Sequence, residues 1–391
     1  MTQIDFDQLI DRSGTHSLKY TARQRLFGRE DAIPLWVADM DFAAPQAVSQ
    51  ALSARAQHPL YGYTEYSAAL YQAVQQWFSR RHHWEIAAEH IVICPGVVPS
   101  LHATILALTE PADKVIVQPP VYFPFFTAVT ETQRTLLHNP LLLVDDVYQI
   151  NFEQLALQAA MGAKMLLLCS PHNPGGRVWS EAELQQLLEI ARQYQLIIVS
   201  DEIHADLVLT NRRHIPLATL AQEVPVITAV SPSKTFNIAG LGMSMLIVPD
   251  AGYKKAIESV FNTWHVSAAN PFSIEATIAA YQQGESWLDA LLDYLQQTCQ
   301  WVQQFFATEL PKIRVLPIQA TYLLWLDCRA LQLNDKQLGR FFVEQAGVAM
   351  NPGVMFGDGG SGFMRMNIAA PRAIIEQACR QIVSAWEAMP Q

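Results

Sequence analysis

The sequence lacks a Cys-x-x-Cys pair, and its five cysteines are an odd number spread along 391 residues. Most of them stand in apolar runs, as Cys94 and Cys169 do. This spacing argues against a disulfide-stapled scaffold and against a zinc site built on thiolates. We expect buried, free thiols in a reducing compartment.

Long apolar runs are also missing. No uninterrupted run approaches the roughly 18 residues that a membrane-spanning helix needs. Residues 1–14 carry acidic side chains where a secretory signal has a basic start and an apolar stretch. Together with the cysteines, these features predict a cytoplasmic protein that does not enter a membrane.

Charged residues are scarce, at 16% of the chain, and they are mostly acidic. There are 26 Lys and Arg against 36 Asp and Glu, a formal net charge of −10. An acidic surface argues against nucleic acid or an anionic membrane as a partner. Hydrophobic residues make up half of the chain, which is ample for a large core, and the length makes two domains the default expectation.

The middle of the chain contains short apolar runs rich in Val, Ile and Leu. The strand candidates are residues 91–93, 114–118, 164–169, 196–200, 226–230 and 243–248. Because both of their faces are apolar, they are typical of a parallel or mixed sheet covered on both sides. Helical patterns lie between them, such as residues 181–194, which follow Ser180 as N-cap with Glu183 three residues on. This alternation predicts an α/β core.

The pattern changes after about residue 285. The expected order is a long helix at 286–307, strands at 314–316 and 321–327, a helix at 335–345, a strand at 363–367 and a helix at 372–387. We interpret this part as a smaller α+β domain onto which the first 45 residues fold back. The predicted division is a large domain, residues 46–284, and a small discontinuous domain, residues 1–45 and 285–391.

Four polar or glycine-containing clusters follow predicted strands, which is where open α/β sheets bind ligands. The first is Gly96 with Val97 and Val98, at the start of a helix that runs to residue 108. Backbone N–H groups at such a start can approach a phosphate. The second is the loop at residues 170–176, whose two prolines rigidify it and aim the amide of Asn173. An ordinary turn would explain either cluster taken alone.

The third cluster places Asp201, His204 and Asp206 after the strand at 196–200. A carboxylate at the end of an apolar strand needs a partner, because an isolated charge there is costly. A buried ion pair or a helix cap would supply one. We expect no metal, because no further His, Cys or carboxylate group follows at ligand spacing.

The fourth cluster is Ser231-Pro-Ser233-Lys234, after the strand at 226–230. A lysine between small hydroxyl residues at a strand end can be desolvated, which lowers its pKa and makes it a nucleophile for carbonyls. This is no Walker A loop, because the glycines required before the lysine are absent. A single lysine is more often a solvated residue on the surface, so it is the four clusters together that indicate a binding site.

An asparagine, an aspartate and a lysine at three strand ends match the needs of pyridoxal 5′-phosphate (PLP). This cofactor requires a lysine for its aldehyde, a carboxylate for its ring nitrogen, a donor to its 3′-oxygen and an anion cradle. The order and spacing of these clusters resemble those of the fold-type I PLP enzymes of the aspartate aminotransferase superfamily, and the resemblance covers nearly the whole chain. The resemblance implies a large domain with a mixed, mostly parallel seven-stranded sheet between helices, plus a smaller α+β domain.

Within that superfamily the chain most resembles the MalY/PatB-type cystathionine β-lyases (C–S lyases). The shared features are Ala38-Asp-Met-Asp-Phe42, Tyr61-Gly-Tyr63, Cys169-Ser-Pro-His-Asn-Pro174, Ser200-Asp-Glu-Ile-His204, Ser233-Lys-Thr-Phe-Asn237, Ala279-Ala-Tyr-Gln-Gln-Gly284 and Thr321-Tyr-Leu-Leu-Trp-Leu-Asp327. The resemblance implies a homodimer with shared active sites and a small amino-acid substrate.

The resemblance also implies roles for single residues. Lys234, Asp201 and Tyr122 are the implied catalytic residues: the lysine binds PLP covalently, the aspartate pairs with the pyridinium and the tyrosine stacks on the ring. The implied PLP site comprises Gly96, Val97, Val98, Tyr122, Asn173, Asp201, His204, Ser231, Ser233 and Lys234, with Tyr63 reaching in from the other subunit. The implied substrate site comprises Arg365, Tyr63 and Asn173, with the arginine on the substrate carboxylate, a task suited to its fork.

Two positions depart from the aminotransferase pattern. Gly242 stands where typical members have an arginine, and His204 stands where they have a tyrosine. Both match the C–S lyase branch, whose reaction is α,β-elimination of L-cystathionine and related cysteine S-conjugates to homocysteine or another thiol, pyruvate and ammonia. Two alternatives stay open: a class I/II aminotransferase, and a regulatory protein-binding role whose surface cannot be recognised in the sequence.

Overall fold

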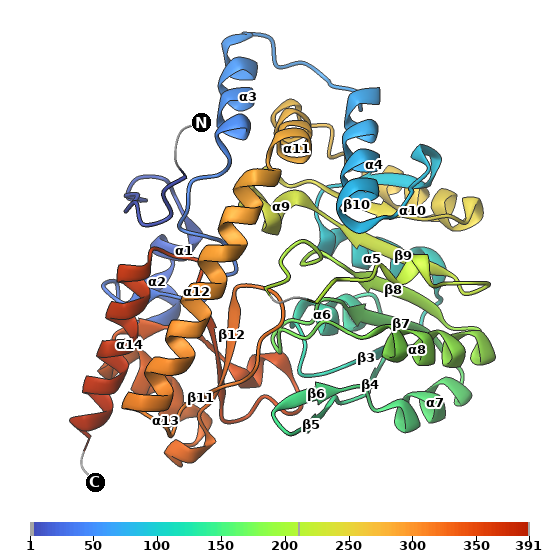
Figure 1. Cartoon of the computed structure of the whole chain (residues 1–391). Helices are drawn as coiled ribbons and strands as arrows, with labels where there is room; N and C mark the ends of the chain where they lie inside the picture. The colour runs from blue at the N-terminus through green and yellow to red at the C-terminus, as the bar shows by residue number, and fades with distance from the viewer. Residues whose placement is uncertain (1–3, 210–211, 390–391) are drawn as a thin grey trace.

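The computed structural model describes residues 4–209 and 212–389, and seven strands form one mixed sheet at its centre (Figure 1). In spatial order the strands are β2 (Ile91–Cys94), β10 (Ser244–Ile247), β9 (Val226–Val230), β8 (Ile197–Asp201), β7 (Ala163–Cys169), β3 (Lys114–Val117) and β4 (Thr135–His138). Strand β10 is antiparallel to both of its neighbours, β2 and β9, and the other adjacent strands in this sheet are parallel. The predicted mostly parallel, seven-stranded sheet is therefore confirmed.

Helices cover both faces of this sheet. Leu166 and Leu168 of β7 pack into one core with α7 (Phe152–Ala160) and α8 (Glu181–Tyr194). Met165 and Leu167, which alternate with them, pack into another core with α5 (Val97–Leu108), α6 (Pro124–Thr130) and α10 (Ala251–Trp264). Successive side chains of a strand point to opposite faces, so a doubly covered strand is apolar throughout.

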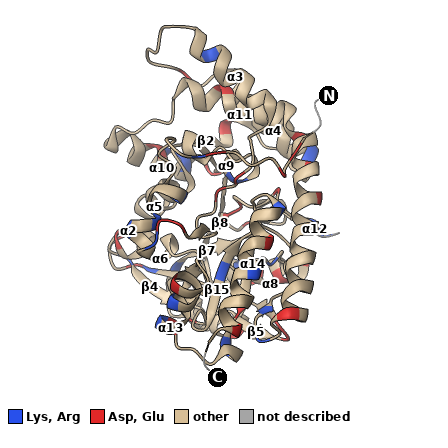
Figure 2. Ribbon diagram, turned by 90° about the vertical axis from the view of Figure 1, so that its left-hand side faces the viewer, with Lys and Arg blue, Asp and Glu red and all other residues tan. Residues whose placement is uncertain are grey.

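Three further helices pack together at one end of the molecule. They are α3 (Gln46–Gln57), α4 (Ala68–His82) and α11 (Pro271–Gln283), and they stay grouped in both views (Figures 1 and 2). The segment between α3 and α4 carries the exposed side chains of Leu60, Tyr61 and Tyr63. A stretch of chain with three exposed large apolar residues among four is typical of a contact surface.

The C-terminal part is an α+β unit, as predicted. The long helix α12 (Glu285–Glu309) is followed by a four-stranded antiparallel sheet in the order β11 (Arg314–Val315), β12 (Leu323–Asp327), β15 (Phe363–Asn367) and β14 (Asn351–Pro352). Helix α13 (Asp335–Arg340) continues into a π-helical turn, Phe341–Gln345, and α14 (Arg372–Glu387) is the last helix. The helix expected at 335–345 is thus one helix that widens midway.

The N-terminal segment lies on this C-terminal unit. Strand β1 (Ile33–Pro34) pairs in parallel with β13 (Val348–Ala349), and the N–H of Asp41 donates to the carbonyl of Ala369. One apolar cluster nevertheless includes Leu70 together with Leu324, so the core continues across the expected boundary. The division at residues 45/46 and 284/285 stays a prediction.

Among the described residues, no helix has the length and apolar character needed to cross a membrane.

Candidate active site

The four clusters found in the sequence meet at one edge of the seven-stranded sheet. Strands β2, β7, β8 and β9 run in the same direction, so the residues that follow them lie at the same edge. They surround a cavity of about 430 Å³. Its wall includes the predicted residues Gly96, Val97, Val98, Tyr122, Asn173, Asp201, His204, Ser231, Ser233, Lys234 and Arg365.

Lys234 enters the cavity from a single helical turn. Helix α9 (Pro232–Thr235) follows β9, and Ser231 caps it by accepting the N–H of Ser233 at 3.1 Å. The Lys234 Nζ donates to the carbonyl oxygen of Ala38 at 2.6 Å. Burial, followed by the charge of Arg365, lowers the pKa of Lys234 to about 8. A substantial fraction of this amine is therefore neutral near physiological pH, as a nucleophile or base must be.

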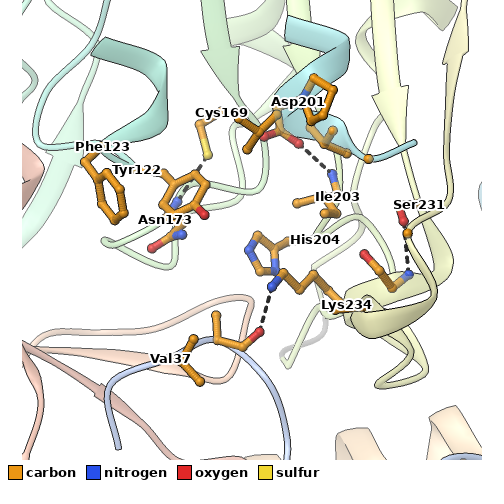
Figure 3. A pocket seen from close by; sticks show the side chains of 18 of the residues that line it. Val37, Tyr122, Phe123, Cys169, Asn173, Asp201, Ile203, His204, Ser231 and Lys234 are labelled. Atoms are coloured by element: carbon orange, nitrogen blue, oxygen red, sulfur yellow. Dashed lines mark hydrogen bonds between the residues drawn. The ribbon is translucent and has the colours of Figure 1, made fainter. Parts of the chain in front are cut away.

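Asp201 ends β8 and faces the cavity (Figure 3). Its carboxylate accepts the N–H of Ile203 at 3.1 Å. Burial raises the pKa of Asp201 to about 7, and the charge of Glu202 acts in the same direction. Such a carboxylate is stabilised by a cation placed against it, because the solvation it lost on burial is replaced.

His204 and Asn173 also line the cavity, His204 beside Lys234 and Asn173 beside Tyr122 (Figure 3). The Nδ1 atom of His204 is buried and has no hydrogen-bond partner among the described residues. Burial, followed by the charges of Lys234 and Arg365, lowers the pKa of His204 to about 3, so the ring is neutral. A buried polar atom without a partner is costly, which indicates a ligand atom in the cavity.

The start of α5 forms an anion-binding end of the cavity. Gly96 precedes the helix with φ 150°, a conformation that favours glycine, and no side chain caps the helix here. The first N–H groups of the helix therefore lack partners within it and carry the positive end of its dipole. Ser231 and Ser233 add hydroxyl groups to the same cavity wall.

Arg365 comes from β15 and reaches the cavity from the C-terminal unit. Its Nη1 donates to Asn173 Oδ1 at 3.0 Å, and its Nη2 donates to Asn351 Oδ1 at 2.7 Å and to the carbonyl of Trp36 at 2.9 Å. The buried Nε has no partner among the described residues. Burial lowers the pKa of Arg365 to about 10, so the side chain is still a cation at neutral pH.

The cavity residues fit PLP. Polar ligand atoms would supply partners for the Nδ1 atom of His204, which has none in the described part of the chain, and for the buried carboxylate of Asp201. The start of α5, which no described side chain caps, is suited to bind a phosphate. Lys234 Nζ supplies the amine that an aldehyde requires. Arg365 lines the same cavity, and its guanidinium group is suited to bind a carboxylate.

Asp206, the third polar residue of its cluster, does not join the cavity. Its carboxylate accepts hydrogen bonds from Trp77, His82 and Thr235. Asp201, His204 and Asp206 thus do not share one site. The described part of the chain holds no group of three His, Cys, Asp or Glu side chains placed to bind a metal ion.

The structure adds cavity residues that the sequence pattern did not identify. Trp36, Val37 and Ala38 line it from the N-terminal segment, and Asn351 lines it from β14. These residues are far from the four clusters in sequence, and only tertiary pairing brings them to the cavity. Tyr63, in contrast, is not part of the cavity wall in this single chain, where its side chain is fully exposed.

Comparison with known proteins agrees with this geometry. The family model for aminotransferase class I and II matches residues 30–382. Cystathionine beta-lyase PatB of Bacillus subtilis (strain 168) is 40% identical over 385 residues, which are 98% of this chain and 100% of PatB. Protein MalY of Escherichia coli (strain K12) is 32% identical over 389 residues, 98% of this chain and 99% of MalY.

A solved structure extends the comparison to the cofactor. Cystalysin from Treponema denticola, whose crystal structure contains PLP, matches with a TM-score of 0.96 and 33% identity, over 98% of this chain and 99% of cystalysin. The chain therefore belongs to the class I and II aminotransferase family of PLP-dependent enzymes, within its PatB- and MalY-like branch.

Proposed function

We propose that the protein is a PLP-dependent C–S lyase. It catalyses α,β-elimination of L-cystathionine and related cysteine S-conjugates to homocysteine or another thiol, pyruvate and ammonia. The observation that carries the proposal is the convergence of Lys234, Asp201 and Arg365 on one cavity in a chain 40% identical to a cystathionine β-lyase over its length.

Lys234, Asp201 and Tyr122 act at the cofactor. When bound, PLP draws negative charge away from the substrate Cα. Lys234 anchors the cofactor and then removes the Cα proton at Nζ, a task for which its pKa of about 8 is suited. Asp201 would pair with the ring nitrogen and keep it protonated, and Tyr122 would pack against the ring. His204 and Asn173 supply polar groups at the ring edge.

Arg365 orients the substrate. Its guanidinium binds the α-carboxylate, beside the amide of Asn173, and leaves the Cβ–S bond free to break. The Cα–H and Cβ–S bonds are lost and the sulfur departs as a thiol. The remaining three-carbon fragment still carries the amino nitrogen; it takes up one water and leaves as pyruvate and ammonia, so atoms and charge balance.

The phosphate end requires a second chain in this proposal. Gly96, Val97, Val98, Ser231 and Ser233 hold the phosphate from one subunit. Tyr63 joins them from the partner of a homodimer and also borders the substrate. Its full exposure here, beside exposed Leu60 and Tyr61, supports an interface at this segment.

The location proposed for this enzyme is the cytoplasm. The five cysteines are free and buried in the structure. Thiols in that state are typical of a reducing compartment.

A pyruvate assay tests the proposed reaction. Given L-cystathionine and no keto acid, the purified enzyme should release pyruvate, ammonia and homocysteine over many turnovers, and Lys234→Ala should release none. An aminotransferase would stop after one turnover until a keto acid arrived. A single-turnover stop that 2-oxoglutarate relieves would therefore transfer the assignment to an aminotransferase. A protein with only a binding role would be unaffected by the loss of Lys234.

A further inference from the structure

Asp206 is a buried carboxylate that the proposed reaction does not use. Its Oδ1 accepts from Trp77 Nε1 at 3.1 Å and from His82 Nε2 at 2.7 Å, both on α4. Its Oδ2 accepts from Thr235 Oγ1 at 2.8 Å. Asp206 is 7% exposed and Thr235 is fully buried, so these bonds are shielded from water. The carboxylate therefore joins α4 directly to α9.

The charge state of this group follows from its partners. Burial alone would raise the pKa of Asp206, but the hydrogen bonds from His82 and Thr235 outweigh burial and hold the pKa below its usual range. An ionised carboxylate only accepts hydrogen bonds, so His82 Nε2 carries the proton in its bond to Asp206. Hydrogen bonds to an ionised acceptor are about twice as strong as neutral ones.

Helix α9 needs such an external anchor. It has four residues, and a single helical turn is not stable by itself. Ser231 fixes its beginning, by accepting from the Ser233 N–H and by donating to the carbonyl of Met243 at 2.7 Å. Thr235 fixes its end through Asp206. Lys234 stands between these two anchors, so they decide where its side chain points.

The Trp77 side of the anchor is buried and packs against the chain just after α9. Trp77 is fully buried, and its ring contacts Phe236, the residue after Thr235, at 5.4 Å between centroids. The indole that donates to Asp206 thus also packs against the end of α9. A displacement of the carboxylate would disturb both the polar and the apolar contact.

We propose that Asp206 is a positioning residue that acts through Thr235 to aim Lys234 into the cavity. This proposal rests on the proposed role of Lys234 in binding PLP. The carboxylate touches neither the cavity nor the cofactor site, and its hydrogen bond to α9 is made through one hydroxyl group. That hydroxyl can be removed with almost no change in side-chain shape.

The experiment compares Thr235→Val with Thr235→Ser in the holoenzyme. Valine deletes the bond to Asp206, and serine keeps it. Thr298→Val is the matched control, because Thr298 is fully buried in α12 and its hydroxyl makes one bond, to the Tyr294 carbonyl at 2.9 Å. The measurements are kcat and KM for L-cystathionine, the rate of PLP loss, the fraction of PLP fixed to Lys234 by borohydride, and the melting temperature.

We expect Thr235→Val to lower kcat roughly tenfold or more, since small displacements of a reacting group have effects of that order. KM should change little, because Arg365 and Asn173 are untouched. PLP should leave faster, and less of it should be fixed to Lys234. Thr235→Ser should restore all of these values. Thr298→Val should lower the melting temperature by an amount comparable to that of Thr235→Val and should leave kcat unchanged.

Equal kcat and equal PLP retention in Thr235→Val and Thr235→Ser would overturn the proposal, and so would an equal loss in Thr298→Val. Failure of the proposed function has a different signature: the unmutated holoenzyme would release no pyruvate. In that case PLP retention on Lys234 still tests the role of Asp206.

Discussion

Arg365 and Asn173 are hydrogen-bonded, with 3.0 Å between Nη1 of the arginine and Oδ1 of the amide. The arginine belongs to β15 of the C-terminal unit and the asparagine to the loop after β7 of the central sheet. The bond therefore spans the cavity wall and joins the two sheets. It also holds the guanidinium in a fixed orientation before any substrate arrives, which lowers the entropy lost when a carboxylate binds.

Arg365→Lys should cut kcat/KM by roughly a hundredfold, about 3 kcal/mol, although it keeps the positive charge. A lysine cannot reproduce a two-pronged bond to a carboxylate together with the bonds to Asn173 and Asn351. The visible absorbance of the bound cofactor should stay nearly unchanged. Arg380→Lys on the exposed face of α14 is the control, and kinetics equal to that control would contradict the assignment.

Asp201→Asn should stabilise the cofactor-free protein at pH 8 while it impairs PLP function. The pKa of Asp201 is raised from 3.8 to about 7, mainly by burial. The folded chain thus keeps a proton that the unfolded chain loses, and stability falls as pH rises from about 4 to about 7. Asparagine carries no charge at any pH and avoids this loss, which amounts to roughly 4 kcal/mol at most.

Melting temperatures of the unmutated protein and of Asp201→Asn, both without cofactor, at pH 5 and pH 8 test this prediction. The variant should melt higher than the unmutated protein by a smaller margin at pH 5, where the loss has only begun, than at pH 8, where it is complete. With PLP added the order should change, since only aspartate supplies the negative charge that stabilises a protonated ring nitrogen. A variant that is less stable at both pH values would show that Asp201 has a structural role instead.

The proposed partner role of Tyr63 can be tested by mixing two impaired variants at a PLP concentration too low to saturate Tyr63→Ala. Lys234→Ala lacks the anchor for PLP, and Tyr63→Ala lacks the proposed phosphate contact. Loss of that contact should weaken PLP binding by about 1.5–3 kcal/mol. If Tyr63 serves the neighbouring subunit, a mixed dimer contains one site with both residues intact. Activity should then reappear after the two variants are unfolded and refolded together.

Refolding each variant alone is the control for that experiment. No recovery on mixing, in dimers shown to be mixed by mass spectrometry, would place Tyr63 and Lys234 in the site of the same chain. An active monomer in the ultracentrifuge would remove the shared site altogether.

Most strands of the central sheet and the active-site edge were predictable because their signals are local, whereas the spatial order of the strands was not predicted. A strand buried on both faces is apolar throughout, and the polar residues that follow it mark its end, as Asp201 does for β8. Strand β4 was not identified, because it lies at the edge of the sheet and its residues, Thr135–His138, are partly exposed. Its composition is that of an ordinary loop or helix fragment.

Residues brought to the site by tertiary pairing could not be predicted in the same way. Ala38 contributes a backbone carbonyl, which any residue type has, and Asn351 lies on a two-residue strand. In the third cluster, the direction of each side chain could not be predicted from the sequence. Asp201 and Asp206 look alike in sequence, yet one faces the cavity and the other binds Trp77 and His82 behind it. The Asp206 carboxylate is directed by distant donors on α4, whereas the Asp201 carboxylate accepts from its neighbour Ile203.

The reactivity of Lys234 should follow an unusually low pKa. Burial first, and the positive charge of Arg365 second, lower the pKa of this amine from 10.5 to about 8 in the cofactor-free chain. The neutral amine is the nucleophile, and its fraction rises as pH passes through the pKa. The rate at which added PLP becomes attached to the protein should therefore increase with a midpoint near pH 8. Borohydride reduction followed by peptide mass spectrometry measures this attachment at Lys234.

The variant Arg365→Gln separates the two causes. Removal of a nearby positive charge stabilises the ammonium form, so the midpoint should move upward. It should stay below 10.5, because burial is the larger cause and is unchanged. Lys234→Ala supplies the baseline, with no attachment at this position. A midpoint close to that of an ordinary lysine in the unmutated protein would mean that Lys234 is solvated, and that the cavity does not activate it.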